Sequence, residues 1–200
     1  MVDAGWPNQE TTFLKYLKTL SIEPKDISLI LLTHGHWDHS ASVNALKRLT
    51  GCKVAINRRE KDWAEQSLKL LPSGGSLGRK ILKAIVRMYM SSVTFPGTSV
   101  DLVLEDKDFP LETYGIHGKV IYTPGHSPGS MSLLLDTGDA FVGDLAMNGL
   151  PLTTRPGMSI WAEDTVASVE SCRLLLARGA KWIYPAHWKY FKIDALKRLL

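Results

Sequence analysis

The chain has 200 residues, of which 44% are hydrophobic and 22% are charged, a composition that suits one soluble globular domain and excludes a disordered chain. Its net charge is +4, but Lys and Arg are spread along the sequence and interleaved with Asp and Glu, which argues against a nucleic-acid-binding protein. No apolar run approaches the ~18 residues that span a bilayer, and no signal-like segment opens the chain, so we expect a cytoplasmic protein without membrane contact.

The first half predicts a strand, a loop, a helix and a second strand in succession. Ile27–Thr33 is an almost continuous apolar run, typical of a strand buried on both faces. Ser40 is expected to cap a helix that runs to about Leu49, with Gly51 just beyond its end. Lys53–Asn57 has the composition of the next strand.

A helical insert is predicted at about residues 58–92. Its apolar residues recur at helical spacing, and Pro72–Ser76 divides it into two pieces. Packing of the insert onto the sheet is the favoured interpretation, and a mobile lid over the site is the alternative.

The second half is richer in strand patterns and contains one long helix. Asp136–Asp139 predicts a hairpin turn, and Asp164 begins an amphipathic helix that stops at Gly179. The expected strands are Val100–Leu104, Lys119–Thr123, Met131–Leu135, Ala140–Val142 and Lys181–Tyr184. The helix residues expected on one face are Val166, Val169, Cys172 and Leu176.

Cys52 and Cys172 lack the paired spacing of a thiolate metal site, so we expect two small buried hydrophobes.

Potential metal ligands follow the predicted strands, at the point where each strand ends. These residues are His34, His36 and His39 after the first strand, then His126, Asp144 and His187. Strands that end at one rim of a scaffold would bring such side chains to the same rim, where loops carry function.

The spacing within the first group allows one segment to serve two metal ions. His34 and His36 lie two residues apart, so an extended backbone directs both imidazoles to one side. Asp38 and His39 follow Trp37, where the chain must turn, so they can face a neighbouring position. Imidazole and carboxylate ligands suit Zn²⁺, while Fe²⁺ and Mn²⁺ are the alternatives.

These motifs resemble those of the metallo-β-lactamase superfamily. The resemblance rests on Thr33-His-Gly-His-Trp-Asp-His39, Thr123-Pro-Gly-His126, Gly143-Asp144 and Pro185-Ala-His187, which occur in the family's order. It implies an αββα four-layer sandwich over residues 1–200 as a single domain. Because the family's Asp3 motif normally follows one or more strands, we expect this chain to lack the usual first strand or strands, and an open sheet edge would favour a homodimer.

The resemblance also implies a role for each ligand. His34, His36 and His126 would bind the first ion, Asp38, His39 and His187 would bind the second, and Asp144 would bridge them. Asp3 matches a position whose carboxylate orients the metal-binding loop through hydrogen bonds.

The activity implied is hydrolysis of a small-molecule ester, thioester or lactone, with two metal ions, most simply zinc, activating a bridging hydroxide. Asp38 and Asp144 are the candidate catalytic residues, Asp38 as a proton relay. A mononuclear iron sulfur dioxygenase, of the persulfide-dioxygenase kind, is the alternative from another class. A true β-lactamase is a further alternative, although such enzymes usually carry Cys or Ser at the position of Asp144, and a non-catalytic relative would usually have lost ligands.

Several neighbouring residues have simpler interpretations. His117 is expected in a solvated loop, and Ser127 and Ser130 are expected to shape a turn beside His126 rather than act as nucleophiles. The residues that either line an apolar pocket or pack in the core are Leu145, Met147, Leu150 and Trp161. Trp188 departs from the family pattern, in which a small residue, often Gly, follows the last ligand.

Overall fold

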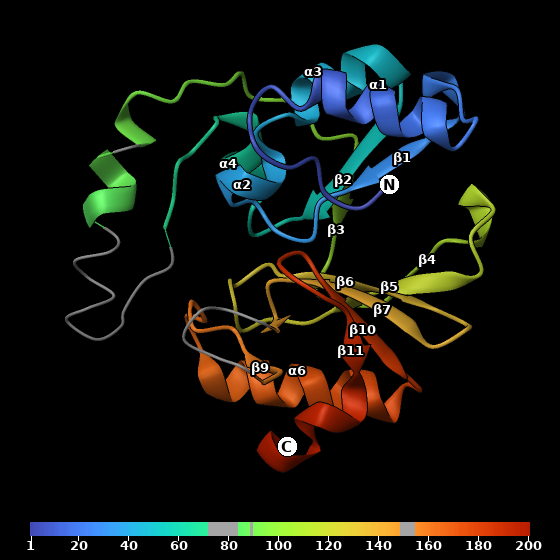
Figure 1. Cartoon of the computed structure of the whole chain (residues 1–200), viewed down its shortest axis with the longest axis vertical. Helices are drawn as coiled ribbons and strands as arrows, with labels where there is room; N and C mark the ends of the chain where they lie inside the picture. The colour runs from blue at the N-terminus through green and yellow to red at the C-terminus, as the bar shows by residue number, and fades with distance from the viewer. Residues whose placement is uncertain (72–83, 89, 149–154) are drawn as a thin grey trace. The chain divides into compact units, whose positions relative to one another are not determined.

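The computed structural model describes residues 1–71, 84–88, 90–148 and 155–200, which fall into two compact units, Met1–Val103 and Leu104–Leu200 (Figure 1). Parts of the predicted insert, residues 72–83 and 89, lie outside the described residues, as does Leu150. In the described part of the insert, α4 (Lys61–Glu65) and residues 84–88, 90 and 91 are helical. How the insert packs stays a prediction.

The first unit is built around a three-stranded sheet in the order β1 (Leu29–Leu31), β2 (Lys53–Asn57) and β3 (Leu102–Leu104). β1 and β2 are parallel, with Ile30 paired to Val54. The helices of this unit include α1 (Glu10–Thr19), η1 (Pro24–Asp26), α2 (Trp37–Ser40), α3 (Val43–Thr50) and α4. Apolar side chains of β1, β2 and α3 form its core, among them Ile30, Ile56 and Leu46.

The helix between β1 and β2 differs from the prediction at its start. The expected cap at Ser40 is wrong, because Ser40 ends the short helix α2 and its Oγ donates a hydrogen bond back to the His36 carbonyl at 3.0 Å. The longer helix α3 begins at Val43 instead. Its end is as predicted, since Gly51 has the left-handed φ of 71° of a C-terminal cap. The predicted strand Lys53–Asn57 is confirmed in its bounds.

The first residues of the chain run along the outer edge of β1. Val2 forms a parallel bridge with Leu31, and the Asp3 amide donates to the Leu31 carbonyl at 2.8 Å. In return, the Leu31 amide donates to the Met1 carbonyl at 3.0 Å. These bonds occupy the β1 edge itself, while the homodimer expected from an open edge stays a prediction.

The second unit contains a mixed six-stranded sheet in the order β11, β10, β7, β6, β5, β4. The bounds of its strands are β4 (Phe109–Pro110), β5 (Gly118–Tyr122), β6 (Met131–Leu135), β7 (Asp139–Gly143), β10 (Trp182–Pro185) and β11 (Phe191–Lys192). β7 and β10 are parallel, and the other pairs are antiparallel. A separate ribbon joins β8 (Ala146–Met147) to β9 (Gly157–Met158).

Helical segments complete the second unit. Figure 1 shows α6 (Thr165–Ala177) across one face of the sheet, and the shared core includes Val142, Ile183 and Leu175. The 3-10 helices are η2 (Glu112–Tyr114) and η3 (Ile193–Leu199). Within the described residues, no helix has the length and apolar character needed to cross a bilayer.

The pattern of the second half is largely confirmed. The hairpin between β6 and β7 forms at the predicted turn, where Gly138 has φ 94°. The Asp164 carboxylate accepts the Ala167 amide at 2.9 Å and so caps α6 as expected. The predicted apolar face is wrong in part, because Val166 is 73% exposed and the buried residues include Ser168 and Ser171.

Both cysteines are free and buried, as predicted. Burial raises the pKa of the Cys172 thiol to about 12, so this side chain is a neutral packing group at physiological pH. His117 lies exposed in a loop, and Leu145 belongs to the core of the second unit.

Candidate metal centre

The loop that follows β1 carries four of the predicted ligands. The imidazoles of His34, His36 and His39 are buried, and the ring centroid of His34 lies 4.7 Å from that of His36 and 4.0 Å from that of His39. α2 begins at Trp37, so the chain turns between His36 and Asp38 as the spacing predicted. The Asp38 carboxylate, partly exposed, has Oδ2 at 3.7 Å from Nε2 of His39.

Asp3 fixes both ends of this loop. Its carboxylate accepts the Thr33 amide at 2.7 Å and the Thr33 hydroxyl at 2.9 Å, and its Oδ2 lies 2.8 Å from Nδ1 of His39. A carboxylate at Nδ1 holds the proton there and leaves Nε2 of His39 as the nitrogen for a metal ion. The hydrogen bonding expected of Asp3 is therefore present.

Glu60, which the sequence analysis did not identify, contacts the same loop. Its side chain is fully buried, and its Oε2 accepts the amide of Gly35 at 2.5 Å. The run Arg58-Arg59-Glu60-Lys61 has the pattern of a solvated surface, and no periodicity in it indicates that one carboxylate points inward.

Three more predicted ligands gather in the second unit at the ends of its strands. His126 follows β5, Asp144 follows β7 and His187 follows β10. The Asp144 carboxylate is 6% exposed, with Oδ2 at 3.7 Å from Nε2 of His126 and Oδ1 at 3.5 Å from Nε2 of His187. Because β7 and β10 are parallel neighbours, their carboxyl ends deliver Asp144 and His187 to the same edge of the sheet.

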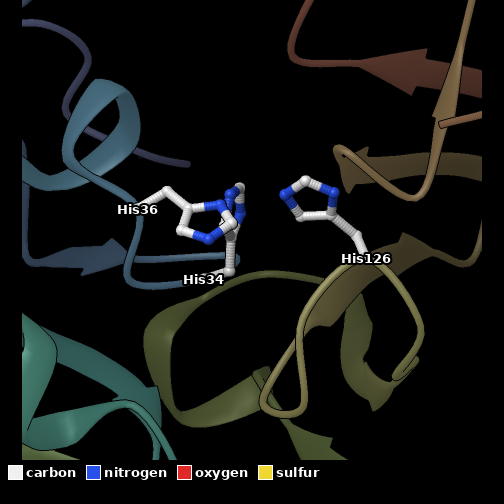
Figure 2. A group of neighbouring side chains, drawn as sticks. All are labelled: His34, His36 and His126. Atoms are coloured by element: carbon white, nitrogen blue, oxygen red, sulfur yellow. The ribbon is translucent and has the colours of Figure 1, made fainter. Parts of the chain in front are cut away.

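The His126 loop is shaped by close packing against α6. Gly125 has φ 140°, and a Cβ there would lie 2.5 Å from the amide nitrogen of Ser168, so only glycine fits. Ser127 and Ser130 are buried and their hydroxyl oxygens are 2.7 Å apart. This agrees with the prediction of a turn beside the ligand. Figure 2 shows His34 and His36 extending from the loop after β1, and His126 extending from the loop after β5.

The donor set fits divalent metal ions. All seven predicted ligands are among the described side chains whose atoms could hold a metal. Five are imidazoles and two are carboxylates, the combination that zinc and iron sites in proteins use. An imidazole oriented by a carboxylate, as His39 is by Asp3, is a common feature of such sites.

Fold and motifs together define the class of protein. Residues 1–187 match the family model of the metallo-beta-lactamase superfamily, and the chain belongs to this superfamily. The predicted fold family is confirmed, as an α/β fold with mixed sheets.

Curated relatives are distant and include several kinds of hydrolase. A probable metallo-hydrolase of Bacillus subtilis is 30% identical over 137 residues, which cover 68% of this chain and 56% of the relative. An N-acyl homoserine lactonase of Azorhizobium caulinodans is 27% identical over 210 residues, which cover 95% of this chain and 71% of the relative. A glyoxylase B2 of Dictyostelium discoideum is 30% identical over 66% of this chain and 38% of the relative. The chain thus spans only about half, or less, of two of these three proteins.

Solved structures agree on the fold. A B3 metallo-beta-lactamase superposes with a TM-score of 0.69 at 21% identity, over 98% of this chain and 84% of the other. A protein in a di-iron-bound form gives a TM-score of 0.67 at 22% identity, over 98% of this chain and 85% of the other. At such identities these structures support the fold alone.

Proposed function

We propose that this metallo-hydrolase is a dinuclear enzyme that cleaves a small ester, thioester or lactone. The observation that carries the proposal is the buried Asp144 carboxylate, whose two oxygens face His126 and His187 separately. That arrangement suits a carboxylate shared by two ions. We keep the ligand sets implied by the sequence: His34, His36 and His126 for one ion, Asp38, His39 and His187 for the other, and Asp144 for both.

The bound ions would supply a water acidified from a pKa of 15.7 to about 7 and an electrophile for the carbonyl oxygen. Side chains of the protein would orient the metal ligands and transfer the proton. Asp3 fixes the ring orientation of His39. Asp38, which is partly exposed and has Oδ2 at 3.7 Å from Nε2 of His39, would accept a proton from the attacking water and pass it to the leaving group.

The substrate class is supported by the relatives. Lactonases and a glyoxylase are among the curated proteins that match this chain. The β-lactamase alternative has weaker support, because Asp144 occupies the position where such enzymes usually have Cys or Ser. Zinc is the proposed metal, and the di-iron form of one protein of this fold makes iron the competing choice.

Metal content per chain is the first test. The protein would be purified without chelators or a histidine tag and analysed by mass spectrometry, and about two zinc ions per chain are expected. A single iron would overturn the dinuclear hydrolase and direct the work to oxygen-dependent sulfur chemistry.

Asp144→Ala is the matching variant. It should lose at least one metal equivalent and lower turnover of its best lactone, thioester or ester substrate by several orders of magnitude. Asp136→Ala, an exposed carboxylate in the β6–β7 turn, is the control and should retain both properties. Full activity in the Asp144 variant would contradict the bridging role, and efficient hydrolysis of a cephalosporin with no lactone, thioester or ester turnover would contradict the substrate class.

A further inference from the structure

We infer that Glu60 is a positioning residue, which holds the backbone between His34 and His36 so that both imidazoles are set before a metal ion binds. The inference rests on the proposed function, because it assigns Glu60 to the ligand loop of that site. Glu60 is not itself a candidate ligand. Among the described residues, the side chains that lie close enough together to share a metal ion are the seven His and Asp residues named above.

The hydrogen bond between Glu60 and Gly35 is the first ground for this inference. Gly35 is the residue between the two ligands, and its amide donates to Oε2 of the fully buried Glu60 at 2.5 Å. A fully buried carboxyl group is tolerated only where hydrogen bonds satisfy its oxygens. The bond therefore ties the middle of the loop to a fixed point.

The Glu60 backbone provides that fixed point. Its amide donates to the Asn57 carbonyl at 3.0 Å, at the end of β2, and its carbonyl accepts the Trp63 amide at 3.0 Å in the first turn of α4. Glu60 is the residue that precedes α4. The carboxylate therefore extends from the junction of a strand and a helix, a rigid support for a ligand loop.

Packing from α4 acts on the same loop. A Cβ at Gly35 would lie 2.9 Å from the Trp63 Cβ and 3.3 Å from the Glu60 Cβ, so the loop backbone rests directly on these two side chains. The Trp63 indole stacks on the His36 imidazole, with ring centroids 5.8 Å apart and planes at 20°. Glu60 thus fixes the backbone while Trp63 limits the rotation of one ligand.

Glu60 and Asp3 hold different parts of the loop. Asp3 bonds to Thr33 and His39 at the two ends, and Glu60 bonds to Gly35 near the middle. With only Asp3 in place, the segment that carries His34 and His36 would lack its buried backbone acceptor. We therefore expect loss of the Glu60 acceptor to weaken metal binding even though every ligand remains.

Three substitutions at Glu60 separate a positioning hydrogen bond from a buried charge. Glu60→Gln keeps a carbonyl oxygen at the same reach, Glu60→Asp keeps the charge but withdraws the oxygen by one methylene, and Glu60→Ala removes both. Asp62→Asn, at an exposed carboxylate in the first turn of α4, is the control. Zinc affinity would be measured by competition with a chromophoric chelator.

Amide hydrogen exchange of residues 33–40 in metal-free protein would be the second measurement. Glu60→Ala and Glu60→Asp should bind zinc about 10- to 100-fold more weakly, the usual effect of losing a group that orients ligands, and should exchange the Gly35 amide faster. Glu60→Gln and the control should stay near the wild type on both measurements.

The results distinguish the inference from the proposed function. If the wild type binds no zinc, the proposed metal site fails, and the Gly35 exchange rate still tests the hold of Glu60 on the loop. Wild-type affinity and protection in a folded Glu60→Asp protein would overturn the inference. If Glu60→Ala does not fold, the comparison of Asp with Gln decides, and weakening by Gln with Asp near the wild type would overturn the positioning bond in favour of a buried charge.

Discussion

Trp188 has a backbone conformation that normally belongs to glycine. It follows the ligand His187, its φ is 71°, and its indole is 49% exposed with the ring centroid 5.6 Å from that of His187. A parallel bridge to Asn148 holds this segment in place. A positive φ is costly for any residue with a Cβ, which explains why a small residue, often Gly, suits this position.

The strain can be measured by comparing Trp188→Gly with Trp188→Ala. Both variants lose the indole, but only glycine adopts a positive φ without cost, so the Gly variant should be more stable than the Ala variant by about 1 kcal/mol. Urea denaturation gives both free energies of unfolding. Equal stabilities, or a more stable Ala variant, would show that the backbone at Trp188 is unstrained.

Residues of the candidate site differ in how far the sequence could identify them. His34, Asp38 and His39 belong to one short motif, and imidazole and carboxylate side chains at such close spacing are typical of a metal site. Glu60 bonds to the same loop across 25 positions of sequence and stands in a run of charges. Which of several neighbouring charged residues turns inward depends on tertiary packing, so no local pattern could have selected it.

At the scale of elements, Asp101 joins α3 to β2. Its Oδ2 lies 2.6 Å from the Lys47 ammonium and accepts the Val54 amide at 2.8 Å. Partial burial would raise the pKa of this carboxyl, but the hydrogen bond and charge of Lys47, together with the Val54 amide, outweigh burial and lower the pKa below its ordinary 3.8. The ionised form is therefore the one that stabilises the fold.

The stabilisation from Asp101 should depend on pH in a defined direction. A lowered folded-state pKa gives stability that is present above the unfolded value, near 3.8, and is lost as the pH falls through the folded value. Asp101→Asn should therefore be less stable than the wild type at pH 7, by on the order of 1 kcal/mol, and the difference should shrink toward pH 3. Urea denaturation at pH 7, 5 and 3 measures it. A difference that is constant across this range would refute the assignment.

Helices and strands with a strong apolar pattern or a clear capping residue could be predicted from the sequence. Very short strands, and buried positions occupied by polar residues, could not. β2 and β6 have continuous apolar or alternating patterns, and Asp164 is a clear cap. β11 is two residues long, too short to show any period. In α6, Ser171 faces inward because its hydroxyl donates to the Pro124 carbonyl at 2.7 Å, so a polar residue occupies a buried position that an apolar pattern assigns elsewhere.

At the scale of the whole molecule, metal ions should contribute directly to stability. Five of the seven proposed ligands are buried in the folded chain, and an unfolded chain cannot present seven donors in one geometry. An ion that binds only the folded state stabilises it by RT ln(1 + [metal]/Kd), which is about 2.7 kcal/mol for one site at a free metal concentration 100 times Kd.

Differential scanning calorimetry with zinc and after chelation tests this linkage. For a chain of this length, such a gain corresponds to a rise in Tm of roughly 5 to 10 °C per site, so the chelated protein should unfold at distinctly lower temperature. Asp144→Ala should show a smaller zinc-dependent rise, because the proposed shared carboxylate is gone, whereas Asp136→Ala should match the wild type. A Tm that is the same with zinc and with chelator would mean that these histidines and carboxylates do not hold a metal in the folded protein.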